Sequence, residues 1–365
     1  MPRTSLILLA VVVLAGCTST TAGTGASASD PPASPTAGPA AADAALTDIG
    51  SGLAGPAGLA ASVYASGLAN VSAFAFDVDG RLWATTAAYD DTGTDAVYLI
   101  ASAGATPVKV IGALHTPLGL VWANGTLYVA SAGRVDAYSG LTGTAFTRHA
   151  TVIALPAGVG EVNGLVLSPA ERLVLGVSAP CDACTPTTEF AAAVVSVLPD
   201  GSDLRVEAGG IRAPVGLAYV PGTTDLFVTM NQRDDLGDAT PGDWLAVVRA
   251  GQTWGFPDCY GQGGTSCDGV PTPLAVLDKH AAVAGIAIVT GQLGAEVGTS
   301  ALVAEWATGK VMRVALSPDG DGYTPGGAEP FLAGLTNPVP IALAPDGAVL
   351  VGDWGTGTIY RIAAT

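Results

Sequence analysis

Four ionisable side chains recur at one position of a repeated segment and could carry chemistry. His115, Glu161, Arg212 and His280 each lie just before an apolar run of strand type, and the chain has only three histidines. A histidine can act as a general acid or base near neutral pH because its unperturbed pKa lies close by. If the four side chains meet in one pocket, we expect catalytic roles for Glu161, His115 and His280. The alternative is that each residue ends a strand and contacts only water.

A second group of polar side chains has the composition of a calcium site. Five oxygen-bearing side chains lie within residues 231–243, and oxygen ligands suit a hard cation such as calcium better than zinc. The spacing is not that of an EF-hand, and no glutamate closes the loop. The alternative is an acidic turn in contact with solvent. The candidate ligands are Asn231, Asp234, Asp235, Asp238 and Asp243.

A segment made of two short apolar runs and a turn recurs six times, and it must position these residues. In Gly216–Met230, a small residue precedes an alternating apolar run, Pro221 and Gly222 make the turn, and a second apolar run follows. This pattern predicts two antiparallel strands, and a third apolar run comes after each copy. The spacing of roughly 45 to 69 residues is typical of propeller repeats. The copies begin at Ala73, Gly119, Gly164, Gly216, Gly285 and Pro340.

Six such units predict an all-β, six-bladed β-propeller whose sheets stack around a channel. The ring must close, so we expect the last run, Ile359–Ile362, to share a sheet with Ser62–Ala65. Equivalent points of the repeats should reach the same height around the axis. The four ionisable side chains should therefore converge at one mouth of the channel, with His115 facing His280. Polar residues at the same point complete this ring: Asn70, Thr116, Asn163 and Asn337.

Composition excludes several function classes. The 365 residues include 49 glycines and 25 prolines, which suits many turns and short strands. A net charge of -17 argues against nucleic acid as a partner, and it means that an anionic ligand would need its own local cations. The chain has no phosphate-binding loop, dinucleotide-binding fingerprint, zinc-protease motif or nucleophile elbow. No extended apolar surface is evident, so we expect a monomer.

The first 55 residues predict export and a tether. Arg3 and the apolar run Leu6–Leu14 are typical of a signal peptide, and Leu14-Ala15-Gly16-Cys17 looks like a lipobox, where bacterial lipoproteins are cleaved and acylated. We expect a lipoprotein signal peptide over 1–16, a lipid on Cys17, and an extracytoplasmic protein anchored to the bacterial cell membrane. An ordinary secretory leader is the alternative. Residues 17–55, rich in Ala, Ser, Thr and Pro, predict a disordered linker before a propeller over 56–365.

The remaining four cysteines suggest structural disulfides. An even number of cysteines in an oxidising compartment favours pairing, and local pairing is the simplest of the three connectivities. A redox-active or zinc-binding Cys-x-x-Cys is the alternative, but it lacks the usual sequence context. The expected pairs are Cys181 with Cys184 and Cys259 with Cys267.

Three segments resemble the soluble glucose/sorbosone dehydrogenase family. These are Gly210–Ala218, Asn231–Asp243 and Gly251–Cys259, within a resemblance that runs from about Leu59 to Ile362. The resemblance implies a six-bladed propeller, pyrroloquinoline quinone (PQQ) as cofactor, calcium in the acidic loop, and a sugar or aldehyde as substrate. It also implies that Arg212, Asn163, Lys310 and Asn337 are the residues available to hold the cofactor.

The chain departs from that family where the family's chemistry is done. The position of the family's catalytic histidine is Gly160, with Glu161 beside it, and the family's asparagine next to Arg212 is Ala213. The basic residues of the last blade correspond to Asn337 and Val339. We therefore keep three hypotheses: a PQQ-dependent dehydrogenase with a rearranged base, a non-catalytic propeller that binds a sugar, a cell-wall fragment or a protein, and, more distantly, a metal-dependent lactonase.

Overall fold

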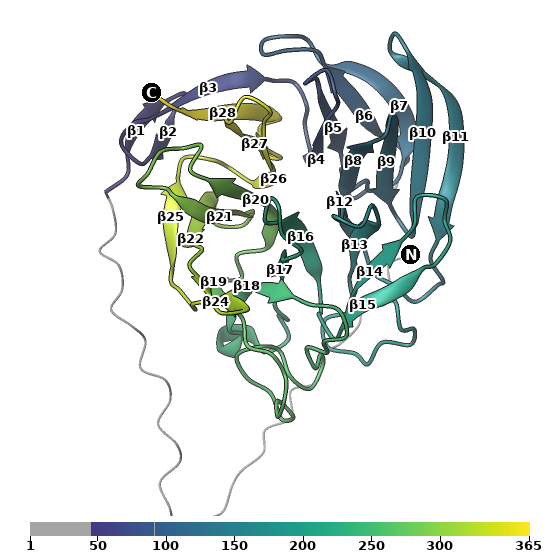
Figure 1. Cartoon of the computed structure of the whole chain (residues 1–365), viewed down its shortest axis with the longest axis vertical. Helices are drawn as coiled ribbons and strands as arrows, with labels where there is room; N and C mark the ends of the chain where they lie inside the picture. Colours follow the sequence, from purple (N-terminus) through teal and green to yellow (C-terminus); the bar gives the residue numbers. More distant parts are fainter. Residues whose placement is uncertain (1–44, 91) are drawn as a thin grey trace, which may run out of the picture. The chain divides into compact units, whose positions relative to one another are not determined.

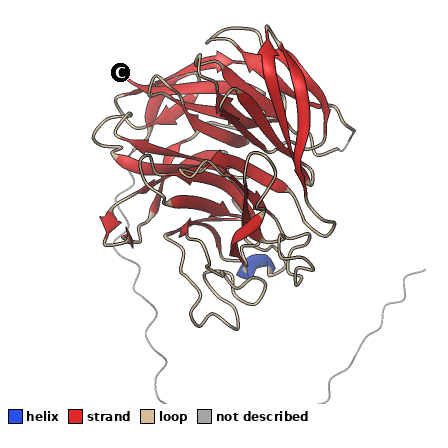
Figure 2. Cartoon of the chain, turned by 45° about the vertical axis from the view of Figure 1, so that its right-hand side comes forward, coloured by secondary structure: helices blue, strands red, loops and turns tan. Residues whose placement is uncertain are grey.

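The computed structural model describes residues 45–90 and 92–365. The predicted signal peptide, the lipid on Cys17 and most of the predicted linker lie outside these residues. The described part consists of strands and turns, with a single 3-10 turn at Gly237–Ala239 (Figure 2). Within it, no helix has the length and apolar character needed to cross a membrane.

Six antiparallel sheets of four strands each form the fold (Figure 1). The first three sheets contain β4 (Val71–Phe76), β5 (Leu82–Thr86), β6 (Asp95–Ile100), β7 (Val108–Leu114); β8 (Gly119–Ala123), β9 (Thr126–Ser131), β10 (Arg134–Thr142), β11 (Ala145–Ala154); and β12 (Val162–Leu167), β13 (Leu173–Val177), β14 (Ala193–Val197), β15 (Arg205–Gly209). The other three contain β16 (Pro214–Tyr219), β17 (Leu226–Met230), β18 (Gly242–Val248), β19 (Ala275–Lys279); β20 (Val283–Thr290), β21 (Thr299–Glu305), β22 (Lys310–Ala315), β25 (Ala328–Leu332); and β26 (Pro338–Leu343), β27 (Val349–Asp353), β28 (Thr358–Ala364), β3 (Leu59–Ala65).

The six sheets form a closed ring, which confirms the six-bladed propeller. The first strand of each sheet contacts the first strand of the next, in the cycle β4, β8, β12, β16, β20, β26 and back to β4. These strands surround the centre of Figure 1. The sixth sheet is completed by β3, and Ile359 pairs with Ala65 and Tyr360 with Val63. The predicted sharing of one sheet by the two distant segments is therefore correct.

The glycine that opens four of the repeats is required by the close approach of neighbouring blades. A Cβ added to Gly216 would lie 2.4 Å from the carbonyl oxygen of Ala284 in the next blade, and one added to Gly285 would lie 2.6 Å from that of Val339. Gly119 and Gly164 meet the next blade in the same way, at 2.7 and 2.6 Å. Since only glycine lets two backbones come this close, the small residue marks the contact between inner strands.

Polar and apolar contacts both connect one blade to the next. The buried Thr229 hydroxyl accepts a hydrogen bond from the Gly216 amide at 2.8 Å and donates one to the Ala284 carbonyl at 2.9 Å. The apolar core lies between blades as well: Phe227 and Leu245 of the fourth sheet share a buried cluster with Ile286 and Val303 of the fifth. Each sheet thus buries its faces against its neighbours, as stacked repeats must.

Part of the segment that the sequence predicts to be a linker is folded. Strands β1 (Thr47–Gly50) and β2 (Leu53–Gly55) form a small hairpin inside the segment expected to be linker. Ile49 and Leu53 are buried in a cluster with Leu332, so this stretch has enough apolar surface to pack. A further short pair, β23 (Pro318–Asp319) with β24 (Gly322–Tyr323), extends a loop of the fifth sheet.

Candidate functional site

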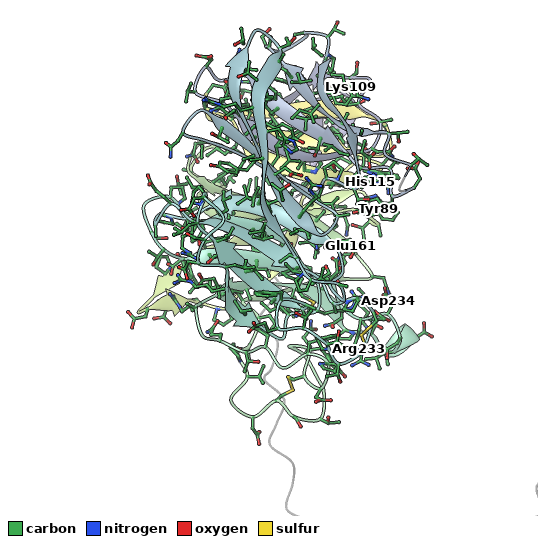
Figure 3. The ribbon with its side chains drawn as sticks, turned by 90° about the vertical axis from the view of Figure 1, so that its right-hand side faces the viewer. Tyr89, Lys109, His115, Glu161, Arg233 and Asp234 are labelled. Atoms are coloured by element: carbon green, nitrogen blue, oxygen red, sulfur yellow. A yellow bond between two sulfur atoms is a disulfide. The ribbon has the colours of Figure 1, made fainter. Side chains whose placement is uncertain are left out.

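A cavity of about 1300 Å³ lies at the centre of the ring, and the first strands of all six sheets line it. Small and apolar side chains of those strands form most of its wall. Most of its charged side chains, and the rings of Tyr89, Trp306 and Trp354, come from the loops at one edge of the sheets, where first strands begin and second strands end. Antiparallel pairing places these two kinds of loop at the same edge. Figure 3 shows Tyr89, His115, Glu161 and Asp234 on one side of the blades.

The structure brings most of the predicted site residues to this cavity. Glu161, Asn163, Arg212 and His280 line it, as do three residues of the acidic loop, Asn231, Asp234 and Asp243. Five predicted site residues are not among the described residues that line the cavity: His115, Lys310, Asn337, Asp235 and Asp238.

The excluded residues have identifiable places. His115 is exposed on the same side of the ring but outside the cavity lining, so it does not face His280 across the cavity. Lys310 forms an ion pair with Asp278. The Asn337 side chain donates to the Trp306 carbonyl at 3.0 Å. An equivalent position in the repeats therefore does not guarantee that a side chain points into the cavity.

Arg212 is held by Asp182, a residue that the sequence did not single out. Its Nη2 lies 2.6 Å from Oδ1 of Asp182, its Nε donates to the Asp182 carbonyl at 3.1 Å, and its Nη1 donates to the Asn231 carbonyl at 3.2 Å. Asp182 also accepts the amide of Asp234 at 2.9 Å. The positive charge of Arg212 is thus already paired, and most of its donors are in use.

The disulfide between Cys181 and Cys184 encloses Asp182, and the second predicted pair, Cys259 with Cys267, is also formed. The predicted local pairing is therefore confirmed. Because Asp182 lies within the four-residue loop that the first disulfide closes, this bridge limits how far the carboxylate can move from Arg212.

The acidic loop does not gather its carboxylates around one point. Arg233 pairs with Asp235 at 2.6 Å, and Nδ1 of His280 lies 2.7 Å from Oδ1 of Asp234. Asp243 accepts the amides of Gln232 and Val283 at 2.7 and 3.1 Å, so it fastens the fourth blade to the fifth. Over the described residues, no group of three or more His, Cys, Asp or Glu side chains is placed to hold a metal ion.

Burial perturbs one carboxyl group at the cavity. Asp243 is 2% exposed, and its burial raises its pKa to about 6 despite the two amide donors. The charge of Asp234 acts in the same direction. The group can therefore change its protonation state in mildly acidic solution.

Glu161 is exposed at the cavity, and none of the described residues pairs with its carboxylate. Its backbone carbonyl accepts the Ser178 amide at 2.9 Å, and the Asn163 side chain donates to the Ser178 hydroxyl at 2.8 Å. Asn163 is therefore engaged in the local structure. The Glu161 side chain remains as the available acceptor at this point of the lining.

Three aromatic side chains on the loops at the cavity were also missed by the sequence analysis. Tyr89, Trp306 and Trp354 all line it, and the two tryptophan rings pack edge to face with centroids 6.0 Å apart. Tyr89 is 57% exposed as a residue. Burial around its hydroxyl and, next, the charge of Glu161 raise its pKa to about 12. Tyr89 and Glu161 are therefore close enough to interact electrostatically.

Comparison with solved structures gives the fold a clear context. The PQQ-bound aldose sugar dehydrogenase of Streptomyces coelicolor has a TM-score of 0.67 and 17% identity, over 85% of this chain and 99% of that one. The soluble aldose sugar dehydrogenase of Escherichia coli, in its apo form, gives 0.64 and 18%, over 84% and 100%. A calcium structure of a Trichoderma reesei protein of Carbohydrate-Active Enzymes Family AA12 gives 0.71 and 17%, over 86% and 97%. A scan against protein-family models and a search of curated proteins found no match.

Proposed function

We propose that this protein is a dehydrogenase-like propeller that binds a small sugar in the central cavity. The observation that carries the proposal is the lining itself: an apolar wall with exposed aromatic rings, a free carboxylate and a guanidinium group at one edge. Such a combination binds sugars, because rings pack on their C–H faces while polar groups bond their hydroxyls. The solved structures named above that share the fold include aldose sugar dehydrogenases.

The lining does not fit PQQ, the cofactor that the resemblance implies. PQQ carries three carboxylates, and burying them requires paired cations or a metal. Within the described lining, Arg212 is the only arginine or lysine, and Asp182 already pairs with it. Glu161, Asp234 and Asp243 add further negative charge. We therefore assign the quinone no place in this cavity.

The main chain leaves no room for a side chain at Gly160, the position that the resemblance assigns to the family's histidine. A Cβ at this position would lie 2.4 Å from the Ala179 carbonyl oxygen and 3.0 Å from the Ser178 Cβ. Any side chain would have to displace the backbone of the neighbouring strand end, so a histidine cannot simply be restored. We propose that Glu161 is instead the acceptor for a hydroxyl of the bound sugar.

Binding and redox assays on the same preparation test the proposal. Leader-free protein would be titrated with aldoses while tryptophan fluorescence is followed, with a Trp306→Ala variant as control. We expect a saturable change that the variant reduces, and no uptake of PQQ by absorbance in the presence of calcium. Dye reduction that depends on PQQ, calcium and an aldose would instead establish the second candidate, sugar oxidation, which the shared fold favours. No response to any aldose would contradict sugar binding.

We further propose that a lipid on Cys17 anchors the protein outside the cytoplasm, as a monomer. The sequence Leu14-Ala15-Gly16-Cys17 supports this part of the proposal. Full-length protein should partition into a detergent phase, whereas a Cys17→Ser variant should not. Equal partitioning of the two proteins would contradict lipidation at this residue.

A further inference from the structure

The charged groups at the cavity leave an excess of negative charge. Four carboxylates line it, those of Glu161, Asp182, Asp234 and Asp243, against Arg212 and His280. Arg212 is paired with Asp182, His280 lies against Asp234, and two backbone amides hold Asp243. The carboxylate of Glu161 is the one left without a partner among the described residues.

The rest of the protein reinforces this local charge. The chain carries a net charge of -17, so the long-range field attracts cations and repels anions. A ligand with its own carboxylates would enter against this field. A ligand with an ammonium group would enter along it, and the attraction would weaken in high salt.

The aromatic side chains of the lining favour the same charge. Tyr89 lines the cavity together with Glu161, and it is more than half exposed. Trp306 is 38% exposed and packs against Trp354. Ring faces attract cations as well as the C–H face of a sugar, so one set of residues can contact both parts of an amino sugar.

The size of the cavity bears on the length of the ligand. Its volume of about 1300 Å³ exceeds that of ordinary small-molecule pockets, which hold roughly 300 to 1,000 Å³. A single pyranose would leave most of it to water. The volume leaves room for more than one sugar unit.

Resting on the proposed sugar binding, we infer that the preferred ligand is a short oligosaccharide carrying free ammonium groups, with an ammonium on Glu161 and its rings against Tyr89, Trp306 and Trp354. Neither the fold nor the family resemblance supplies this preference. It follows from the unpaired carboxylate, the paired arginine and the aromatic residues of the lining.

The test uses ligands that share a ring and differ in charge. Leader-free protein would be titrated by calorimetry with four disaccharides: that of glucosamine, its N-acetylated form, cellobiose and the acidic cellobiuronic acid. We expect the ammonium form to bind about tenfold more tightly than the two neutral disaccharides, from one exposed ion pair and one cation–π contact. The preference should shrink in 0.5 M salt, and the acidic disaccharide should bind least.

Two matched variants locate the effect. Glu161→Gln should remove most of the preference for the ammonium form and weaken cellobiose binding much less, because the amide oxygen of glutamine still accepts a hydrogen bond from a sugar hydroxyl. Glu171→Gln makes the same change at an exposed glutamate outside the lining and should alter neither. Equal affinity for ammonium and neutral disaccharides would overturn the inference while leaving sugar binding intact. Binding of no saccharide would overturn both.

Discussion

The contact between inner strands can be tested by adding a single methyl group to it. In Gly216→Ala the new Cβ would lie 2.4 Å from the Ala284 carbonyl oxygen and 2.9 Å from the Thr229 hydroxyl. Both atoms belong to the hydrogen-bonded connection between the fourth and fifth blades. Ordinary van der Waals contact needs about 3.4 Å or more, so the blades must separate locally by about 1 Å or the strand must twist.

The expected cost follows from that displacement. Forcing an extra carbon into a well-packed site costs about 1 to 3 kcal/mol, and disturbing the buried Thr229 hydrogen bonds adds about 1 kcal/mol. The lower flexibility of alanine in the unfolded chain returns up to about 1 kcal/mol. We therefore expect a loss of about 3 kcal/mol in the free energy of unfolding. For roughly 320 folded residues, this lowers the melting temperature by roughly 4 to 5 °C.

Gly327→Ala provides the control, because no atom lies within 4 Å of its added Cβ and its backbone is not in the left-handed region. Its stability should be unchanged or higher by up to about 1 kcal/mol. Denaturant unfolding followed by circular dichroism measures both variants. If Gly216→Ala were as stable as the parent protein, the close approach of the blades would not constrain the sequence, and our explanation of the repeated glycine would fail.

Two further predictions concern stability. Because Asp243 has a folded-state pKa of about 6 against 3.8 for an unperturbed group, its contribution to the free energy of unfolding is fully present below about pH 4 and is lost as the pH rises through 6, by about 3 kcal/mol. The free energies of unfolding of the parent and of Asp243→Asn, measured from pH 4 to 7, should therefore diverge by about this amount. The same pH dependence in both proteins would contradict the prediction. Replacing both Cys259 and Cys267 by serine should lower stability by about 2 to 3 kcal/mol, since the unfolded chain regains the entropy of the closed loop. An unchanged guanidinium midpoint would refute this.

The repeats could be predicted because each copy carries the same two physical signals. The glycine marks the contact with the next blade, and the apolar runs of the first three strands mark the core, since a strand such as β17 is buried along its whole length. The outer strands carry neither signal. In β7 and β11 most side chains are exposed or half-buried, so Val108–Leu114 and Ala145–Ala154 show no alternation that separates strand from loop.

The site could be predicted only in part because, apart from the acidic loop after β17, we considered only the loops that precede the first strands. Residues before the first strands include Glu161, Arg212 and His280. The loops after the second strands reach the same edge, and they supply the residues that were missed: Tyr89, Asp182, Trp306 and Trp354. Applying the same register to both loops would have found them.

Side-chain direction in these loops could not be predicted from register. Thr116 and His280 both have positive φ angles, and such turns decide whether a side chain points into the cavity or away from it. His280 lines the cavity and His115 does not, although the repeat places them equivalently. The ion pairs of the site also depend on the tertiary structure, since Asp182 pairs with Arg212 although the two are 30 residues apart in the sequence.

The pairing of β3 with β28 has a consequence for how a newly made chain reaches this structure. Thr365 donates a hydrogen bond to the carbonyl of Gly58, 307 residues earlier. During synthesis β3 must therefore wait until every other blade has been translated, while the open faces of the first and fifth blades stay in contact with water or with chaperones. The last residues of β28 pair with the first residues of β3. Losing only these residues should therefore loosen the sixth sheet and, with it, the contacts that this sheet makes with the first and fifth blades.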